Sequence, residues 1–251
     1  MELSEYKKMY DIEDSHWWFN AKRQYINIVL KKFFKNKSGL KILDVGCGTG
    51  AVIEYLRLKN QQAIGVDASD IAIDYCRQKN LPVEKSEAHK TKFSGETFDV
   101  VLALDLLEHL ENPEEAIKEM KRILKQGGLL IATVPAHQFL WSYHDVSLYH
   151  KKRYNKESLA SLFKGEFFIE LISWIHALIL PPVIIIRLKN KLIGSNGGSD
   201  VRQSGKITNL VMKFLYIFEL GFFNIFKYLP FGLSLIIVAR KENNGNDFKN
   251  Q

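Results

Sequence analysis

Cysteine is scarce in this sequence: Cys47 and Cys76 are the only two in 251 residues. Two cysteines are too few for a disulfide framework or a zinc site, so we expect both to be small apolar residues in a reducing compartment and expect no bound metal. Residues 1–19 mix acids with bases and lack the apolar core of a secretory signal. Synthesis is therefore expected to end in the cytosol.

A long uninterrupted apolar run is also missing. A membrane-spanning helix needs about 20 consecutive apolar residues. The apolar stretch between Glu170 and Arg187 is broken by His176 and by the pair Pro181-Pro182. A plain membrane crossing is therefore not expected there.

Residues 210–230 form a second apolar segment, in which the polar side chains fall on one narrow helical stripe. Basic residues flank the segment, and both facts fit a pair of interfacial helices lying on an anionic membrane surface. A homodimer interface or an extra layer of core explains the apolar residues equally well. The stripe comprises Lys213, Tyr216, Asn224 and Lys227, and the flanking residues are Lys189, Lys191, Arg202, Lys206 and Lys213.

The composition is that of a globular protein, with 46% hydrophobic and 25% charged residues. The length suits one domain of ordinary size that carries an appendage. The formal net charge of +7 is compatible with nucleic acid, an anionic membrane surface or a phosphorylated substrate. Net charge alone does not choose among these partners.

Strand patterns alternate with helix patterns from residue 39 to Pro135. This alternation predicts an α/β fold with right-handed βαβ units and helices on both faces of the sheet. The segment 233–240 is rich in β-branched residues, which is typical of a buried last strand. We predict an N-terminal helical cap over 1–38, a sheet domain over 39–170 and 231–241, an apolar helical insertion over 171–230 with a mobile polar loop at 194–206, and a polar tail over 242–251.

The segment LDVGCGTG places three glycines within five residues after the first predicted strand. Gly46, Gly48 and Gly50 have no Cβ atom where a ligand has to touch the backbone, and they permit the positive φ angles of a tight turn. The turn predicts a site for a nucleotide-like group. Glycine-rich turns also bind dinucleotides, so the glycines alone do not identify the ligand.

Three carboxylates surround this turn. Asp44, Asp67 and Glu87 stand at the ends of three successive predicted strands. Asp67 has the position from which a carboxylate reaches ribose hydroxyls, and Glu87 is placed to accept from an exocyclic amine. Acidic strand ends would repel a pyrophosphate, which argues against NAD as the ligand.

Together these motifs resemble the class I S-adenosylmethionine-dependent methyltransferases, and most of all their small-molecule group, which includes the quinone-biosynthetic enzymes. The resemblance runs from about Leu40 to Pro135, with the last strand near 233–240. It implies a Rossmann-like seven-stranded sheet with an antiparallel last strand, and S-adenosylmethionine as cofactor. The implied cofactor-binding residues are Asp44, Gly46 and Gly48 at the methionine end, Asp67 at the ribose, Glu87 and Ala88 at the adenine and Asp105 at the cleft floor, with Cys47, Gly50 and Ala68 beside them; Glu87 departs from the usual aspartate.

Methyl transfer is an in-line displacement at an activated carbon, so most catalysis comes from holding the acceptor in line within a dry site. An alcohol acceptor needs a base as well. Histidines gather in residues 137–154, after the fifth strand, although a polar loop with aromatic anchors would have the same composition. The candidate catalytic residues are His144, Asp145, His150 and His109, the last of which has packing against the adenosine as its alternative, and the candidate substrate contacts there are Trp141, Arg153 as an anion clamp, and Tyr154.

The N-terminal segment HWWF and the arginine that follows it resemble the start of related methyltransferases of uncertain substrate. This resemblance implies a lid over the site. The lid residues are Glu13, His16, Trp17, Trp18 and Arg23, of which His16, Trp17 and Arg23 are counted as substrate contacts. Plain packing is the more common role of a tryptophan pair in a helix.

We therefore expect methyl transfer from S-adenosylmethionine to a hydroxyl of a small, lipophilic or lipid-linked acceptor, in the cytoplasm or on the inner face of the membrane. A quinone-ring C- or O-methyltransferase and a non-catalytic S-adenosylmethionine-binding regulator or scaffold are the alternatives. Methyltransferases that act on amino nitrogens of nucleic acid usually carry an NPPY-like turn after the fourth strand. This chain has LDLLEH there, so no nucleic-acid partner is expected.

Overall fold

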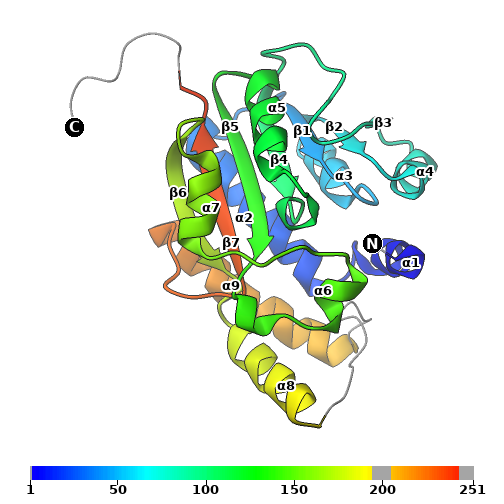
Figure 1. Cartoon of the computed structure of the whole chain (residues 1–251), viewed down its shortest axis with the longest axis vertical. Helices are drawn as coiled ribbons and strands as arrows, with labels where there is room; N and C mark the ends of the chain where they lie inside the picture. The colour runs from blue at the N-terminus through cyan, green and yellow to red at the C-terminus, as the bar shows by residue number, and fades with distance from the viewer. Residues whose placement is uncertain (1, 194–204, 243–251) are drawn as a thin grey trace.

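The computed structural model describes residues 2–193 and 205–242. Its centre is a seven-stranded sheet with the strand order β3-β2-β1-β4-β5-β7-β6 (Figure 1). Neighbours among β1 to β5 pair in parallel, whereas β7 is antiparallel to both β5 and β6, as the family resemblance implied for the last strand. The strands are β1 (Lys41–Val45), β2 (Gln62–Asp67), β3 (Val83–Lys85), β4 (Phe98–Leu104), β5 (Leu124–Pro135), β6 (Phe168–Ile175) and β7 (Ser234–Arg240).

Helices cover both faces of the sheet, so the central strands are apolar on both sides. Successive side chains of β4 alternate: Val101 and Ala103 face the core that α5 and α7 cover, and Val100 and Leu102 face the core that α2, α3 and α9 cover. The α-helices are α1 (Leu3–Ile12), α2 (Trp17–Phe34), α3 (Ala51–Leu58), α4 (Asp70–Gln78), α5 (Pro113–Ile123), α6 (Tyr143–Ser147), α7 (Lys156–Phe163), α8 (Leu180–Ile193) and α9 (Lys206–Phe226), with short 3₁₀ turns η1 (Leu107–His109) and η2 (Gln138–Leu140).

The N-terminal cap contains two helices, not the single helix predicted over 1–38. The chain leaves α1 after Ile12 and starts α2 at Trp17, where the His16 side chain caps the new helix by accepting the Trp18 N–H at 3.3 Å. Tyr25 and Val29 of α2 are fully buried against the sheet. Because of this break, α1 does not continue the axis of α2, and its Met9 lies against Gly48 of the glycine turn.

Two other boundaries differ from the prediction. The helix predicted through Gly128 ends at Ile123, because β5 already begins at Leu124 and pairs there with β4. Residues 171–175 were assigned to the helical insertion but form the second half of β6, whose pairing with β7 satisfies their backbone groups. Most of the polar loop predicted at 194–206 and of the tail predicted at 242–251 lies outside the described residues.

Gly65 keeps the glycine turn close to β2. A Cβ atom at Gly65 would lie 2.7 Å from Cys47 Sγ and would also clash with Ile53. We expect Gly65→Ala to lower the free energy of unfolding by about 1–3 kcal/mol, the usual cost of overpacking a core. Urea denaturation measures this. Gly221→Ala is the control, since a Cβ there meets nothing within 4 Å, and it should leave stability unchanged or slightly raised.

Candidate active site

The glycine turn joins β1 to α3 at the carboxyl edge of the sheet, where open α/β sheets bind ligands. Gly46, Gly48 and Gly50 all have positive φ, at 74°, 54° and 91°. The N–H groups of Gly46 and Cys47 donate to the Val66 carbonyl at 2.8 and 3.1 Å, which ties the turn to β2. The turn therefore has the positive φ angles that the three glycines were predicted to permit. Cys47 and Cys76 are both free and buried, as expected.

Asp67, the last residue of β2, is aimed at this turn. One of its carboxylate oxygens accepts the Gly48 N–H at 3.0 Å, and the other accepts the Ser69 N–H at 2.9 Å. Burial raises the pKa of Asp67, and these backbone donors oppose the rise. The acid is thus fixed in orientation by the backbone on either side of it.

Asp44 and Asp105 complete the acidic edge. Asp44 is buried, and desolvation together with the nearby charge of Asp67 raises its pKa to about 7. Asp105 follows β4, accepts the Thr133 hydroxyl at 2.8 Å and pairs with Lys22 of α2. Burial alone would raise the pKa of Asp105, but Lys22 outweighs it and holds that pKa at about 2. The two neighbouring acids therefore have opposite electrostatic surroundings.

The outer part of the predicted cofactor site is open. Glu87 lies two residues beyond the end of β3 and is exposed, while Ala88 beside it is buried. Ala68, after β2, is exposed as well. These three residues have the positions that the resemblance implies, and their contacts with a cofactor stay a prediction.

The N-terminal cap touches the acidic edge at several points. Tyr6 of α1 hydrogen-bonds to the Ser69 side chain beside Asp67, and the methyl group of Met9 lies 3.0 Å from where a Cβ at Gly48 would be. Glu13 is buried and accepts the Thr49 hydroxyl at 2.5 Å. The cap thus covers the glycine turn, and the ion pair between Lys22 and Asp105 adds a contact at the end of β4.

The cap residues that were predicted to contact the substrate make contacts with other residues of the protein. Trp17 stacks on Tyr216 with ring centroids 5.4 Å apart, and Trp18 stacks on His176 at 4.0 Å. Arg23 is buried and donates to the Glu13 carbonyl at 3.0 Å. Trp17 thus attaches the cap to α9, and Trp18 attaches it to the segment between β6 and α8. Arg23 and the helix-capping His16 make contacts within the cap. Direct contact with an acceptor stays a prediction for His16, Trp17 and Arg23.

Asp145 is the centre of the loop after β5. It is fully buried, and its carboxylate accepts from Arg153 Nε at 2.7 Å, Arg153 Nη2 at 3.0 Å and His150 Nδ1 at 3.0 Å. Burial opposes ionisation, but these donors prevail and lower the pKa of Asp145. The histidine that Asp145 orients is His150, and the ring of His144 lies 6.2 Å from that of His150.

Arg153 and Tyr154 are used inside the protein. The Arg153 guanidinium also donates to the Ala136 carbonyl at 3.1 Å, and the side chain is buried. Tyr154 is buried too, and its hydroxyl donates to the Leu107 carbonyl at 3.2 Å. Both side chains hold the loop on the sheet, while Trp141 lies half-buried before α6. A role in acceptor binding stays a prediction for all three.

Glu108 and His109 of η1 meet His150 beneath this loop. The rings of His109 and His150 lie 4.7 Å apart at 78°. Burial and the proximity of His150 lower the pKa of His109 to about 4, and burial raises the pKa of Glu108 well above its usual range. Glu108 was not predicted from the sequence, because an acid at the start of a short turn is usually a solvated or capping residue.

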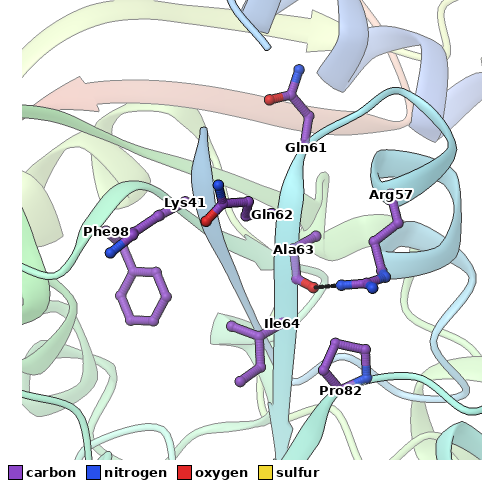
Figure 2. A pocket seen from close by; sticks show the side chains of 8 residues that line it. All are labelled: Lys41, Arg57, Gln61, Gln62, Ala63, Ile64, Pro82 and Phe98. Carbon is purple, nitrogen blue, oxygen red and sulfur yellow. Dashed lines mark hydrogen bonds between the residues drawn. The ribbon is translucent and has the colours of Figure 1, made fainter. Parts of the chain in front are cut away.

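A hollow of about 470 Å³ lies elsewhere, at the amino ends of the strands (Figure 2). Lys41, Gln62 and Phe98, the first residues of β1, β2 and β4, line it, and Arg57 donates to the Ala63 carbonyl beside it at 3.4 Å. The glycine turn and the acids at the strand ends lie on the opposite edge of the sheet, at the carboxyl ends of the strands. The candidate active site is therefore the carboxyl edge and not this hollow.

Comparison with known proteins agrees with the geometry. Residues 43–132 match the family described as "Methyltransferase domain". A curated relative, the ubiquinone biosynthesis O-methyltransferase of Hahella chejuensis (strain KCTC 2396), is 27% identical over 150 residues, which are 53% of this chain and 62% of the relative. The chain thus spans less than two thirds of the length of the curated relatives that match it first.

Solved structures share the fold. The phosphoethanolamine N-methyltransferase 2 of Haemonchus contortus, solved in complex with S-adenosyl-L-methionine, has a TM-score of 0.56 at 18% identity, covering 86% of this chain and 51% of its own. The [4+2]-cyclase SpnF has a TM-score of 0.56 at 20% identity, covering 87% and 80%. Because one of these structures is named as a cyclase, the fold alone does not determine the reaction.

The Lys22–Asp105 ion pair should make the stability of the protein depend on pH. Because the folded-state pKa of Asp105 is about 2, below the ordinary 3.8 of an unfolded aspartate, the pair stabilises the protein fully above about pH 4. Its contribution is lost as the pH falls toward 2. Asp105 keeps some solvent exposure, so we expect Lys22→Met to cost about 1–2 kcal/mol at neutral pH.

Urea denaturation of wild type and Lys22→Met at several pH values tests this. The difference in unfolding free energy should be constant from about pH 5 to 7 and shrink below about pH 4. Asp105→Asn should remove both the difference and its pH dependence in a double-mutant cycle. A difference that is unchanged at about pH 3 would show that Lys22 acts by packing alone.

Proposed function

Because the chain belongs to the class I S-adenosylmethionine-dependent methyltransferase superfamily, we propose that it transfers a methyl group to a hydroxyl oxygen of a lipophilic or lipid-linked small molecule. The observation that supports methyl transfer is the glycine turn with Asp44, Asp67 and Asp105 gathered around it. The observation that supports a lipophilic acceptor is the outer surface of α9.

The residues at the carboxyl edge fit S-adenosylmethionine. The turn has positive φ at three glycines, which lets a ligand lie against the backbone. Asp67 already accepts two N–H groups and has oxygen lone pairs left for ribose hydroxyls. Asp105, paired with Lys22, and the buried Asp44, whose pKa is about 7, add carboxyl groups to the same edge. A dinucleotide would bring its pyrophosphate against the same three carboxylates, which disfavours it.

The cofactor supplies an activated methyl group, so the protein chiefly has to align the acceptor and exclude water. The cap of α1 and α2 contributes the exclusion, since it contacts Gly48 and Asp105 from outside the sheet. We assign removal of the hydroxyl proton to His144 or His150, of which Asp145 orients His150. The pKa of His109, at about 4, makes that residue the weaker base. These residues make a catalytic enzyme a better interpretation than a scaffold.

The name of the Hahella relative favours an aromatic hydroxyl. That relative is called a ubiquinone biosynthesis O-methyltransferase. A quinol with an isoprenoid side chain carries such a hydroxyl on an apolar molecule. It satisfies both parts of the proposal, so we take a long-chain quinol as the acceptor to test first.

α9 docks on the protein partly through polar side chains, and most of its apolar side chains lie on its outer surface. Glu219 is buried and accepts from the Tyr25 hydroxyl and from the Leu178 N–H, the latter at 2.9 Å. The Tyr216 hydroxyl is hydrogen-bonded to His176 Nδ1 at 2.6 Å. The buried contacts of a soluble surface helix are normally apolar. In α9 the buried acid and phenol face the protein, and most of the apolar side chains are left outside.

Phe214, Ile217 and Phe218 are among the exposed side chains of α9, and Phe218 is 69% exposed. Within the described residues, one helix, Ile207–Phe226, is long and apolar enough to cross a membrane by length and composition. Its polar docking contacts would be lost in a crossing, so we propose that it lies in the membrane interface. Lys213 on α9 and Lys189 on α8 are exposed and favour an anionic surface, while Arg202 lies outside the described residues.

This surface adjoins the catalytic edge. The carboxyl end of β5 points toward the end of the molecule where α6, α8 and α9 lie (Figure 1). Arg187 of α8 donates to the Leu140 carbonyl at 2.8 Å and lies 3.6 Å from Asp145. A lipophilic acceptor held in the interface would therefore have a short path to the histidine cluster.

We expect Asp67→Ala to weaken binding of S-adenosylmethionine by roughly 10-fold to 150-fold, because one charge-assisted hydrogen bond to the ribose contributes about 1.5–3 kcal/mol. Isothermal titration calorimetry gives the affinity. Asp70→Ala is the matched control, since Asp70 is exposed three residues along the chain and pairs only with Lys85 among the described residues. Unchanged affinity in Asp67→Ala, or tighter binding of NAD by wild type, would rule out the cofactor assignment.

We expect the double variant Phe214→Glu, Phe218→Glu to lose most binding to vesicles of anionic lipid, because it places charge on the proposed interfacial face. Co-sedimentation measures binding, and transfer of a labelled methyl group to a long-chain quinol in the vesicles measures activity. Leu58→Glu is the control, since Leu58 is 77% exposed but lies on α3. Salt should weaken wild-type binding.

Two outcomes would contradict parts of this proposal. A wild-type protein that ignores vesicles and forms a stable dimer in light scattering would assign the α9 surface to a homodimer. Vesicle binding without transfer to the quinol would keep the interfacial surface and exclude that acceptor.

A further inference from the structure

Glu108, His109 and His150 form a compact group of potential metal ligands. One ligand atom from each of the three residues lies within 4.8 Å of the other two. Glu108 and His109 are neighbours in η1, and His150 comes from the loop after α6, about 40 residues later. The fold therefore brings together side chains that the sequence analysis considered only as separate residues or did not consider at all.

The carboxylate of Glu108 is the observation that needs an explanation. The side chain is 0% exposed, and neither carboxylate oxygen has a hydrogen-bond partner on another residue. A buried carboxylate without partners is costly, and native proteins usually pair it or use it to bind a cation. One of its oxygens lies within 4.8 Å of a ring nitrogen of His109 and of a ring nitrogen of His150.

The two histidines are held as metal ligands usually are. A ligating histidine commonly gives its second ring nitrogen to a carboxylate or a backbone carbonyl, which fixes the ring and the tautomer. His150 Nδ1 is 3.0 Å from the Asp145 carboxylate, and Arg153 holds that carboxylate in place. His109 hydrogen-bonds to the backbone of Leu148. Each histidine has one nitrogen engaged, which leaves the other for an ion.

We propose that Glu108, His109 and His150 bind a divalent transition-metal ion. One carboxylate and two imidazoles suit zinc, iron or manganese better than magnesium or calcium, which prefer oxygen ligands throughout. Three protein ligands leave open coordination positions, as in catalytic metal sites. The site is next to the cofactor turn, since the Leu106 side chain, which precedes η1, lies 2.8 Å from where a Cβ at Gly46 would be.

The position suggests what the ion does. An alcohol or water bound to a divalent ion has a lowered pKa, so an acceptor hydroxyl on the open position would be easier to deprotonate. This part rests on the proposed O-methylation, whereas binding of the ion does not. The scarcity of cysteine gave no reason to expect a metal from the sequence, where these histidines are candidate bases. When the ion is bound, His109 and His150 are its ligands and His144 is the base.

Metal binding is measured without any acceptor. We treat the full-length protein with a chelator, remove the chelator and titrate Zn²⁺, Mn²⁺ and Mg²⁺ by calorimetry, with Co²⁺ absorption and Mn²⁺ electron paramagnetic resonance to report the ligands. We expect one ion per chain, with Zn²⁺ bound more tightly than Mn²⁺ and Mg²⁺ most weakly. Glu108→Gln and His150→Ala should each weaken binding by roughly 100-fold or more, and Asp145→Asn by roughly 10–100-fold.

His89→Ala is the matched control, because His89 is an exposed histidine outside the cluster. It should bind the ion like wild type. S-adenosylmethionine binding, measured on the same preparations, shows whether each variant is folded and reports the proposed function separately. No saturable binding of any of the ions by wild type would overturn the site. So would binding that survives in Glu108→Gln and His150→Ala, since the ion would then lie elsewhere.

Discussion

The cost of burying carboxylates at one edge of the sheet determines much of this structure. A desolvated acid must be paired, hydrogen-bonded or protonated. The protein meets this requirement in a different way at each position: backbone N–H groups at Asp67, a lysine of the cap at Asp105, and an arginine with a histidine at Asp145. At Asp44 burial and a neighbouring acid raise the pKa instead. The cap and the loop after β5 are thus positioned by the acids that they neutralise.

The same requirement explains α9. Glu219 is a buried acid on the inner side of an apolar helix, where its partners are a phenol hydroxyl and a backbone N–H and no cation of the described residues is paired with it. Hydrogen bonds of this kind specify orientation, because a rotated helix would leave Glu219 and Tyr216 without them. Phe223 is buried beside these polar contacts, and most of the other apolar side chains of α9 face outward.

The sheet and the cofactor turn could be predicted from sequence because their signals are local. Periodicity, glycine spacing and an acid at a strand end survive without knowledge of any distant contact. One prediction failed where a distant partner decides, since residues 171–175 became strand through pairing with β7. The break before Trp17 has a local cause, because the His16 side chain caps α2 by accepting the Trp18 N–H. The loop histidines were found, but Glu108 was missed, because its significance lies in burial beside His150.

Pairing between the cap and the acidic edge links cofactor access to cap movement. Met9 lies against the Gly48 backbone, and Lys22 is paired with Asp105, so a ligand entering between α1 and the turn has to displace these contacts. Trp17 stacks on Tyr216 of α9, and Trp18 stacks on His176, which is hydrogen-bonded to Tyr216, so the same cap is joined to α9. An environment that moves α9 would therefore shift the cap as well. If α9 lies in a membrane interface, the surface that delivers a lipophilic acceptor also contacts the cap that covers the cofactor site. Binding of the acceptor and binding of the cofactor would then be coupled through α2 and α9.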